Sequence, residues 1–201
     1  MRILLILISC CLLGVSCTSV RKTTGTENMS FPASKTPVFN EGMTEAVFRG
    51  GMDLYGKYFS GIFALKMESE EKYRMVMMSE VGMTLLDMTY TANDFQLNYC
   101  IEPLQKKALL KLIYHDFLLL TIVPKPDRIK RKVKKTEFVF FRNKDCRDFY
   151  YFKEGQMVEI ISKAFLNRTR IQFSEMNMGS ANSIQIQHKP VKLRMELKRL
   201  K

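Results

Sequence analysis

Residues 58–90 read YFSGIFALKMESEEKYRMVMMSEVGMTLLDMTY, and this stretch decides the fold class. Apolar side chains occupy every second position on both sides of the polar segment 68–71. A period of two is typical of β-strands, in which successive side chains point to opposite faces. The stretch therefore predicts three antiparallel strands joined by short turns, and residues 95–99 predict a fourth.

Beyond this stretch the pattern changes to that of a helix and then returns to strands. Pro103 suits the first turn of a helix. Apolar side chains at helical spacing follow it on one side, at Leu109, Leu110, Ile113, Phe117 and Leu120. Alternating segments then resume at residues 138–140, 149–151, 157–164, 171–173, 184–186 and 191–197. About ten strands with one inserted helix predict a mainly β fold, an antiparallel sheet curled into an open half-barrel that the helix covers.

The central strands are apolar on both faces. Val76 and Met78 point to one face of their strand, and Met75 and Met77 point to the other. A sheet with one wet face does not need this second apolar face. Unbranched, polarizable methionine suits adaptable apolar surfaces. We therefore expect the second apolar face to line the concave side of the sheet, the alternative being an ordinary core.

The amino terminus predicts a lipoprotein signal peptide over residues 1–16. Its apolar run, residues 3–15, is shorter than the roughly 20 residues that span a bilayer. The run leads into LGVSC at residues 13–17, which resembles the lipobox of bacterial lipoproteins and implies a lipid on Cys17. Plain secretion after Ser16 and a lipobox ending at Cys10 are the alternatives.

Residues 17–42 predict a lipidated cysteine followed by a flexible tether, because they are rich in Thr, Ser, Asn, Gly and Pro and lack an apolar period. Residues 43–201 are then the folded domain. By resemblance to lipoprotein sorting rules, Thr18 after Cys17 implies the outer membrane. The basic residues that follow favour a position facing the periplasm.

The 201-residue chain is strongly basic, with a formal net charge of +12 at pH 7. Its densest basic segment is 125–135, and an exported protein with such a segment is not expected to bind nucleic acid. We expect the segment to contact anionic lipid head groups, with a solvated loop as the alternative. The residues assigned to this contact are Arg128, Lys130, Arg131 and Lys132.

The expected domain contains few candidates for catalytic, redox or metal-binding residues. Its cysteines, Cys100 and Cys146, fit either one disulfide or two separate thiols. The sequence shows no CxxC pair and no second ligand cluster, so no metal is expected. The sequence has two histidines, His115 and His188, and contains no HExxH, GxSxG or Gly-rich phosphate loop. We therefore expect no enzyme activity and no catalytic residue. We also expect no cofactor besides the lipid on Cys17. Asp87 is interpreted as a strand residue on a solvated patch.

Residues 73–88, YRMVMMSEVGMTLLDM, resemble the LolB family of outer-membrane lipoprotein receptors. In that family an apolar strand likewise enters a tight turn, aliphatic-Gly-x-Thr, and then a second apolar strand. The preceding strand, the helix and the closing alternating strand occur here in the same order. Two positions depart from the family, because Glu80 stands where proline is usual and Val81 where leucine is usual. The chain also lacks tryptophan.

The resemblance implies an unclosed half-barrel with a helical lid, whose apolar concavity holds the acyl chains of lipoproteins. Val81 matches an exposed leucine that serves membrane insertion of the cargo. The implied partners are outer-membrane lipid and a periplasmic lipoprotein carrier or its lipoprotein cargo, bound by a monomer. The residues expected to line the cavity are Phe63, Leu65, Met75, Met77, Leu85 and Phe117.

A rival interpretation comes from a different class of protein. It is a non-catalytic structural or accessory envelope lipoprotein that binds a protein partner. Its sheet interior would be filled by its own side chains. If the structure shows the six cavity residues closed into a solid core, the carrier interpretation fails.

Overall fold

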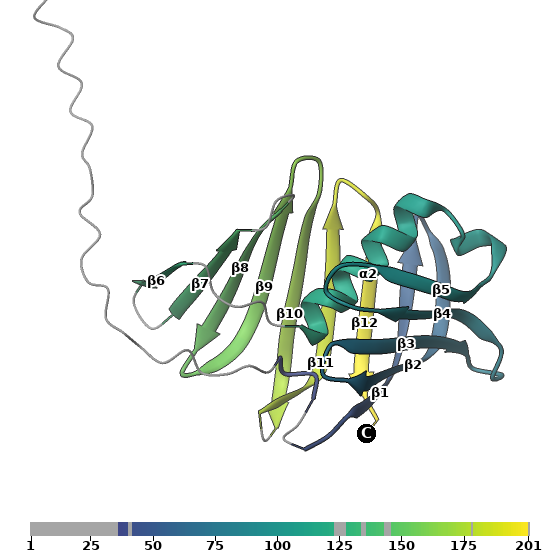
Figure 1. Cartoon of the computed structure of the whole chain (residues 1–201), viewed down its shortest axis with the longest axis horizontal. Coiled ribbons are helices and arrows are strands. Elements are labelled where there is room, and N and C mark those ends of the chain that lie inside the picture. The colour runs from purple at the N-terminus through teal and green to yellow at the C-terminus, as the bar shows by residue number, and fades with distance from the viewer. Residues whose placement is uncertain are drawn as a thin grey trace, which may run out of the picture.

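The computed structural model describes residues 36–39, 42–122, 128–133, 136–142, 146–177 and 179–200. Within these ranges a single 12-stranded sheet forms the body of the fold (Figure 1). Its strands are β1 (Glu45–Leu54), β2 (Lys57–Ser69), β3 (Lys72–Ser79), β4 (Thr84–Tyr90), β5 (Phe95–Cys100), β6 (Arg128–Val133), β7 (Thr136–Arg142), β8 (Cys146–Lys153), β9 (Gln156–Ala164), β10 (Arg168–Asn177), β11 (Ser180–Lys189) and β12 (Leu193–Arg199).

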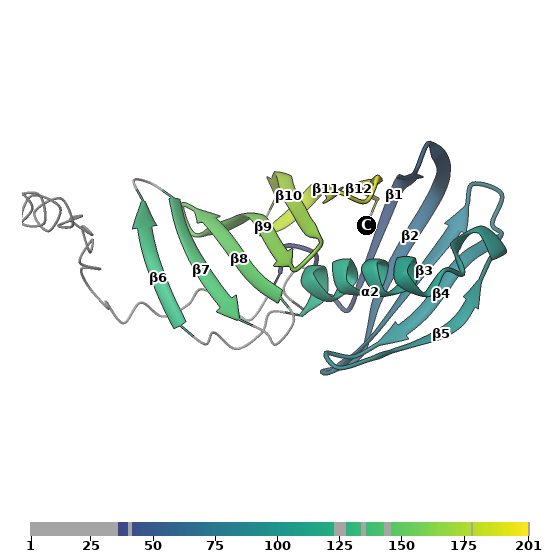
Figure 2. The same ribbon diagram turned by 90° about the horizontal axis from the view of Figure 1, so that it is seen from above.

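The sheet is antiparallel and open. Its strand order is β5-β4-β3-β2-β1-β12-β11-β10-β9-β8-β7-β6, so β12 lies near the middle and β5 and β6 form the edges. Figure 2 shows the strands following an arc whose ends do not meet. The expectation of a mainly β fold with an open, curled antiparallel sheet is therefore confirmed.

Glycines allow neighbouring strands to approach closely where the sheet curls. Gly50 on β1 is paired with Gly61 on β2. A Cβ atom on Gly61 would lie 1.8 Å from the carbonyl oxygen of Met78, and one on Gly50 would lie 2.0 Å from that of Glu196. Since no side chain fits at either position, glycine is what allows β1 to approach β12, and β2 to approach β3, this closely.

The helix α2 (Lys107–Thr121) lies on the concave side of the arc (Figure 2). Pro103 is not part of it, because a short 3-10 turn, η1 (Glu102–Leu104), comes first. The predicted apolar side of the helix is confirmed, since its five members are all buried: Leu109, Leu110, Ile113, Phe117 and Leu120.

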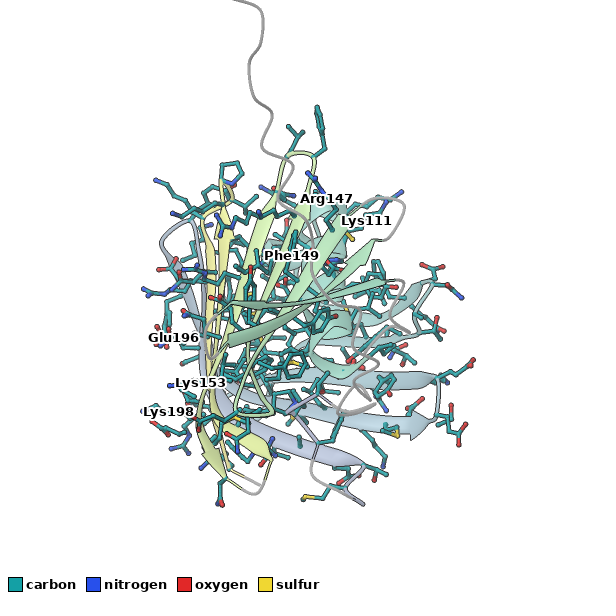
Figure 3. All side chains as sticks on the ribbon, turned by 90° about the vertical axis from the view of Figure 1, so that its left-hand side faces the viewer. Lys111, Arg147, Phe149, Lys153, Glu196 and Lys198 are labelled. Carbon is teal, nitrogen blue, oxygen red and sulfur yellow. The ribbon has the colours of Figure 1, made fainter. Side chains whose placement is uncertain are left out.

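The central strand β12 alternates as its sequence predicts. Leu193, Met195 and Leu197 are buried against the core. Glu196 and Lys198 are exposed and project from the other side of the sheet (Figure 3). One face of this strand is therefore solvated and the other packed.

A short segment before β1 docks onto the core, contrary to the tether predicted over residues 17–42. Val38 and Phe39 are buried, because both are apolar and meet the inner cluster. Ala181 donates its backbone N–H to the carbonyl of Pro37 at 2.8 Å. Arg199 donates to the carbonyl of Val38 and lies over the ring of Phe48, 4.8 Å from its centroid. The rest of the predicted tether, apart from Gly42, lies outside the described residues.

Two strands were not anticipated from the sequence. β1 carries consecutive glycines that interrupt its apolar alternation, and β6 consists mostly of basic residues. The basic segment is therefore not a loop over residues 128–133 but an edge strand of the sheet. Lysine on an edge strand hinders pairing with another chain, which gives this composition a structural reason.

Candidate functional site

The six predicted cavity residues come together on the inner face of the sheet and on α2. None is more than 9% exposed, and all belong to one hydrophobic cluster with the apolar side of the helix. In this conformation the helix therefore fills the space above the strands. The six residues are Phe63 and Leu65 on β2, Met75 and Met77 on β3, Leu85 on β4 and Phe117 on α2.

The second apolar face of β2 and β3 lies on the opposite side of the sheet. Ile62 is paired with Met78, and Ala64 with Val76, and all four side chains are only half-buried. They do not belong to the inner cluster. The expectation that this second face lines the concave side is therefore wrong, because the concave side is formed by the alternate residues of the same strands.

A buried polar link joins α2 to the sheet. The Nε2 atom of His188 on β11 lies 2.9 Å from Oδ2 of Asp116 on α2, and its Nδ1 atom lies 3.1 Å from Oγ1 of Thr169. The side chains of His188 and Asp116 are 1% and 0% exposed. Asp116 was not singled out from the sequence, although it interrupts the apolar side of a helix, and such an interruption indicates a buried partner.

A second polar link holds the end of α2. Tyr90 on β4 places its hydroxyl oxygen 3.2 Å from Oγ1 of Thr121, the last residue of the helix. Thr121 also donates to the carbonyl of Phe117 at 2.7 Å. Burial raises the pKa of the Tyr90 phenol, which therefore stays neutral. Tyr114 on the helix also donates its hydroxyl to the carbonyl of Thr91 at 3.0 Å. The helix is thus held by apolar packing and by several specific hydrogen-bonded contacts.

The turn between β3 and β4 displays apolar side chains to solvent. Val81 is 82% exposed and Met83 is 63% exposed. Ser79 receives the N–H of Gly82 on its carbonyl at 3.0 Å and that of Met83 on its hydroxyl at 3.1 Å. Gly82 has φ +82°, a conformation that favours glycine. The turn is therefore well hydrogen-bonded, and Val81 stands at the tip where the resemblance places it.

A further exposed apolar tip lies between β9 and β10. Phe165 is 97% exposed and Leu166 is 73% exposed. Ala164 donates its N–H to the carbonyl of Asn167 at 2.9 Å and closes the turn. The sequence gives one sign of this tip, an apolar pair followed by asparagine between two alternating segments.

Asp87 does not lie on a solvated patch, so that interpretation is wrong. It is 8% exposed, and Arg74 on β3 donates to both its carboxylate oxygens, at 3.0 and 2.6 Å. Asn98 on β5 donates to it at 3.0 Å. The hydrogen bond from Arg74 holds the pKa of Asp87 below its usual range. Asp87 is paired with Val76, and Arg74 is its diagonal neighbour on β3, so the charge of this buried acid is compensated across the strand pair.

Cys100 and Cys146 do not form a disulfide with each other, so the disulfide alternative is wrong. Cys100 is buried, and burial raises its pKa. Cys146 lies at the start of β8, beside His115 and Asp148. The sequence showed no such cluster, because helix α2 and strand β8 are brought together only by the fold.

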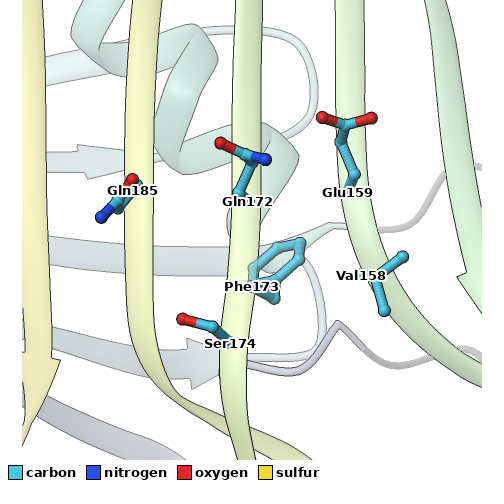
Figure 4. A pocket seen from close by; sticks show the side chains of 6 residues that line it. All are labelled: Val158, Glu159, Gln172, Phe173, Ser174 and Gln185. Atoms are coloured by element: carbon cyan, nitrogen blue, oxygen red, sulfur yellow. The ribbon is translucent and has the colours of Figure 1, made fainter.

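A shallow depression of about 400 Å³ lies over β9, β10 and β11 (Figure 4). It contains Phe173 and Val158, but its other lining side chains are polar: Glu159, Gln172, Ser174 and Gln185. None of the six predicted cavity residues lines it. Its mixed lining makes it a poor match for acyl chains.

The predicted lipidation site lies outside the described residues, as do the signal peptide and Cys17. The side chains of Arg128, Lys130, Arg131 and Lys132 are likewise outside them, so their contact with head groups stays a prediction. Among the residues that the structure covers, no helix is long and apolar enough to cross a membrane.

The fold defines a mainly β protein with an open antiparallel sheet curled around one helix. No family model and no curated protein matches the chain. A similar solved structure is a LolA superfamily protein from Nitrosomonas europaea, with TM-score 0.49 and 7% identity, covering 78% of this chain and 83% of that chain. A second is a putative outer membrane lipoprotein-sorting protein domain from Vibrio parahaemolyticus, with TM-score 0.47 and 7% identity, covering 81% and 86%. A third is a DUF1329 family protein from Desulfovibrio piger, with TM-score 0.44 and 7% identity, covering 79% and 85%.

Proposed function

We propose that the protein is an outer-membrane lipoprotein, anchored through Cys17 and facing the periplasm, that binds acyl chains on the inner face of its sheet. In this role it receives or inserts lipoproteins or lipids by affinity, without turnover chemistry. The observation that carries the proposal is the inner face itself, a broad apolar surface of an open sheet on which α2 lies as a cover.

Binding of an acyl chain on the inner face requires an exchange between helix and lipid, and the apolar free energies of the two can be compared. Burying five apolar side chains of α2 contributes about 8–15 kcal/mol, at about 1.5–3 kcal/mol for each. An acyl chain of about sixteen carbons contributes about 12 kcal/mol, at about 0.8 kcal/mol per methylene. The two apolar contributions are comparable, but an acyl chain that replaces the helix must also offset the loss of the buried His188–Asp116 contact.

A photo-crosslinking experiment tests this site directly. With p-azidophenylalanine in place of Phe63 on the inner face, cells fed an alkyne-tagged fatty acid are expected to yield crosslinks to acylated species. The matched control has the same group at Ile62, the adjacent residue on the opposite face. Crosslinks should form from position 63 and be several-fold weaker from position 62.

Equal labelling from both positions, or none from position 63, would contradict acyl-chain binding on the inner face. Depletion of the protein supplies an independent readout, since a receptor for lipoproteins should leave its cargo mislocalised when it is absent. Normal lipoprotein sorting after depletion would count against a receptor role even if acyl chains bind.

The exposed tip of the β3–β4 turn is the proposed point of membrane contact. Val81→Glu places a charge where insertion into lipid is expected, so delivery of a lipoprotein to liposomes should fall about tenfold or more, since a charge in apolar surroundings is strongly disfavoured. Phe165→Glu is the matched control, because it puts the same charge on another exposed hairpin tip. Delivery should survive in that variant.

The opposite pattern, with loss in Phe165→Glu and none in Val81→Glu, would assign membrane contact to the β9–β10 tip and reject the role of Val81. Circular dichroism of both variants should match the unmodified protein, because both positions are solvent-exposed. If the Val81→Glu variant shows a changed secondary structure, the delivery experiment is repeated with Val81→Gln in its place.

The closed packing of the inner face favours a second candidate, an accessory lipoprotein that binds a protein partner and whose core is permanently filled. Its supporting observation is that all six predicted cavity residues are at most 9% exposed. The crosslinking experiment separates the two candidates, because a permanently filled core predicts no acyl adduct from position 63.

A further inference from the structure

Three side chains with metal-binding atoms converge between α2 and β8. They are His115 on the helix and Cys146 and Asp148 on the strand. Their ligand atoms all lie within 4.8 Å of one another. The sulfur of Cys146 is 3.6 Å from Nε2 of His115 and 3.9 Å from Oδ2 of Asp148.

These distances fit a tetrahedral site. A zinc ion with bonds of about 2.3 Å to sulfur and about 2.0 Å to nitrogen or oxygen separates its ligands by about 3.5–3.6 Å. The sulfur–nitrogen distance of 3.6 Å matches this separation. The sulfur–oxygen distance of 3.9 Å is slightly longer, and a small rotation of the Asp148 side chain would shorten it to the same value. The three atoms are therefore close to positions from which they could share one ion.

The burial of Asp148 is an independent observation that points to a cation. The residue is 6% exposed, and its Oδ1 atom has no hydrogen-bond partner among the described residues. A buried carboxylate oxygen without a partner is costly, and a coordinated cation removes that cost.

The donor set and its accessibility indicate which cation fits. One thiolate, one imidazole and one carboxylate form the mixed set that zinc accepts, whereas magnesium and calcium require oxygen ligands. His115 and Cys146 are half-buried rather than enclosed, so an ion can reach them from solvent. Three protein ligands leave a fourth position for water.

We propose that His115, Cys146 and Asp148 form a binding site for a divalent transition-metal cation of the zinc type. The ion joins α2 to β8, on the opposite half of the sheet from the strands that carry the predicted cavity residues. The site shares α2 with the proposed acyl-chain face, so displacement of the helix by lipid would separate His115 from Cys146. Metal binding is therefore tested in the absence of lipid, and its outcome does not decide whether acyl chains bind.

Cobalt substitution tests the site in the full-length protein. Protein freed of metal by a chelator and titrated with Co²⁺ should bind one ion per site and develop a thiolate-to-cobalt charge-transfer band. Zn²⁺ should displace the cobalt and abolish the band. Cys146→Ser should remove the band and lower Zn²⁺ affinity by about 100-fold or more, beyond the 10–100-fold typical of outer-shell changes.

Cys100→Ser is the matched control, because it removes the other cysteine of the domain, and it should leave the band and the affinity unchanged. His115→Gln and Asp148→Asn should each weaken Zn²⁺ binding while the chain keeps its circular dichroism. Absence of cobalt binding, or a band that persists in Cys146→Ser, would overturn the proposal.

Alkylation of the unmodified protein keeps the test valid should a variant fail to fold. Zn²⁺ should protect Cys146 from iodoacetamide and leave the labelling of Cys100 unchanged, as read by mass spectrometry of the corresponding peptides. Equal labelling of Cys146 with and without Zn²⁺ would also overturn the site.

Discussion

Replacing His188 by leucine is expected to lower the free energy of unfolding by about 3 kcal/mol or more, one of the two largest effects that we predict. Asp116 is fully buried, and its Oδ2 atom bonds to His188 while its Oδ1 atom has no partner among the described residues. Without the imidazole, both oxygens of this buried carboxyl lack a partner. Urea denaturation of the full-length protein, followed by circular dichroism, measures the loss.

Two further variants determine whether the effect comes from the buried pair. Thr169→Val removes only the other hydrogen bond of His188 and should cost about 1 kcal/mol. Asp116→Leu combined with His188→Leu removes both partners, and it should cost less than the sum of the single changes, because no unpaired group remains. A His188→Leu variant within about 1 kcal/mol of the parent would show that the link does not hold the helix.

Replacing Gly61 by alanine is expected to destabilise the protein by about 3 kcal/mol or more, the second large effect. The new Cβ atom would lie 1.8 Å from the carbonyl oxygen of Met78 and 2.8 Å from its carbonyl carbon. Both are backbone atoms of the neighbouring strand, so relief requires separation of β2 from β3. Thermal unfolding should show a clear decrease in Tm.

Ser60→Ala provides the comparison for this position. It makes a similarly small change at the preceding residue of the same strand, and it should alter stability by no more than about 0.5 kcal/mol. A Gly61→Ala protein as stable as Ser60→Ala would mean that β2 and β3 tolerate a wider separation than the structure shows.

Much of the fold could be predicted because its strands and helix follow simple periods. The alternation in residues 58–90 predicted β2, β3 and β4, and helical spacing predicted the buried side of α2. The strand β1 was missed because Gly50 and Gly51 interrupt its alternation. The strand β6 was missed because its basic composition is typical of a solvated loop, while its place at the sheet edge also suits such residues.

The candidate sites were less accessible to sequence reasoning, because they depend on contacts between distant segments. His188 and Asp116 are 72 residues apart, and Cys146 and His115 are 31 apart. Asp87 was misinterpreted for the same reason, since the sequence does not show that Arg74 is its neighbour across the sheet. The exposed position of Val81, by contrast, follows from a local turn, and the resemblance was enough to locate it.

The central position of β12 has a consequence for the order of folding. Arg199 on β12 is paired with Phe48 on β1, so two halves of the sheet meet only when distant ends of the domain have both been made. Such long-range pairing slows folding, because a long loop must close before its contacts form. Until β12 is available, β1 and β11 are each left with an unpaired edge. We infer that the sheet is completed late, after synthesis of the last strand, and that the protein is most vulnerable to aggregation and proteolysis before that step.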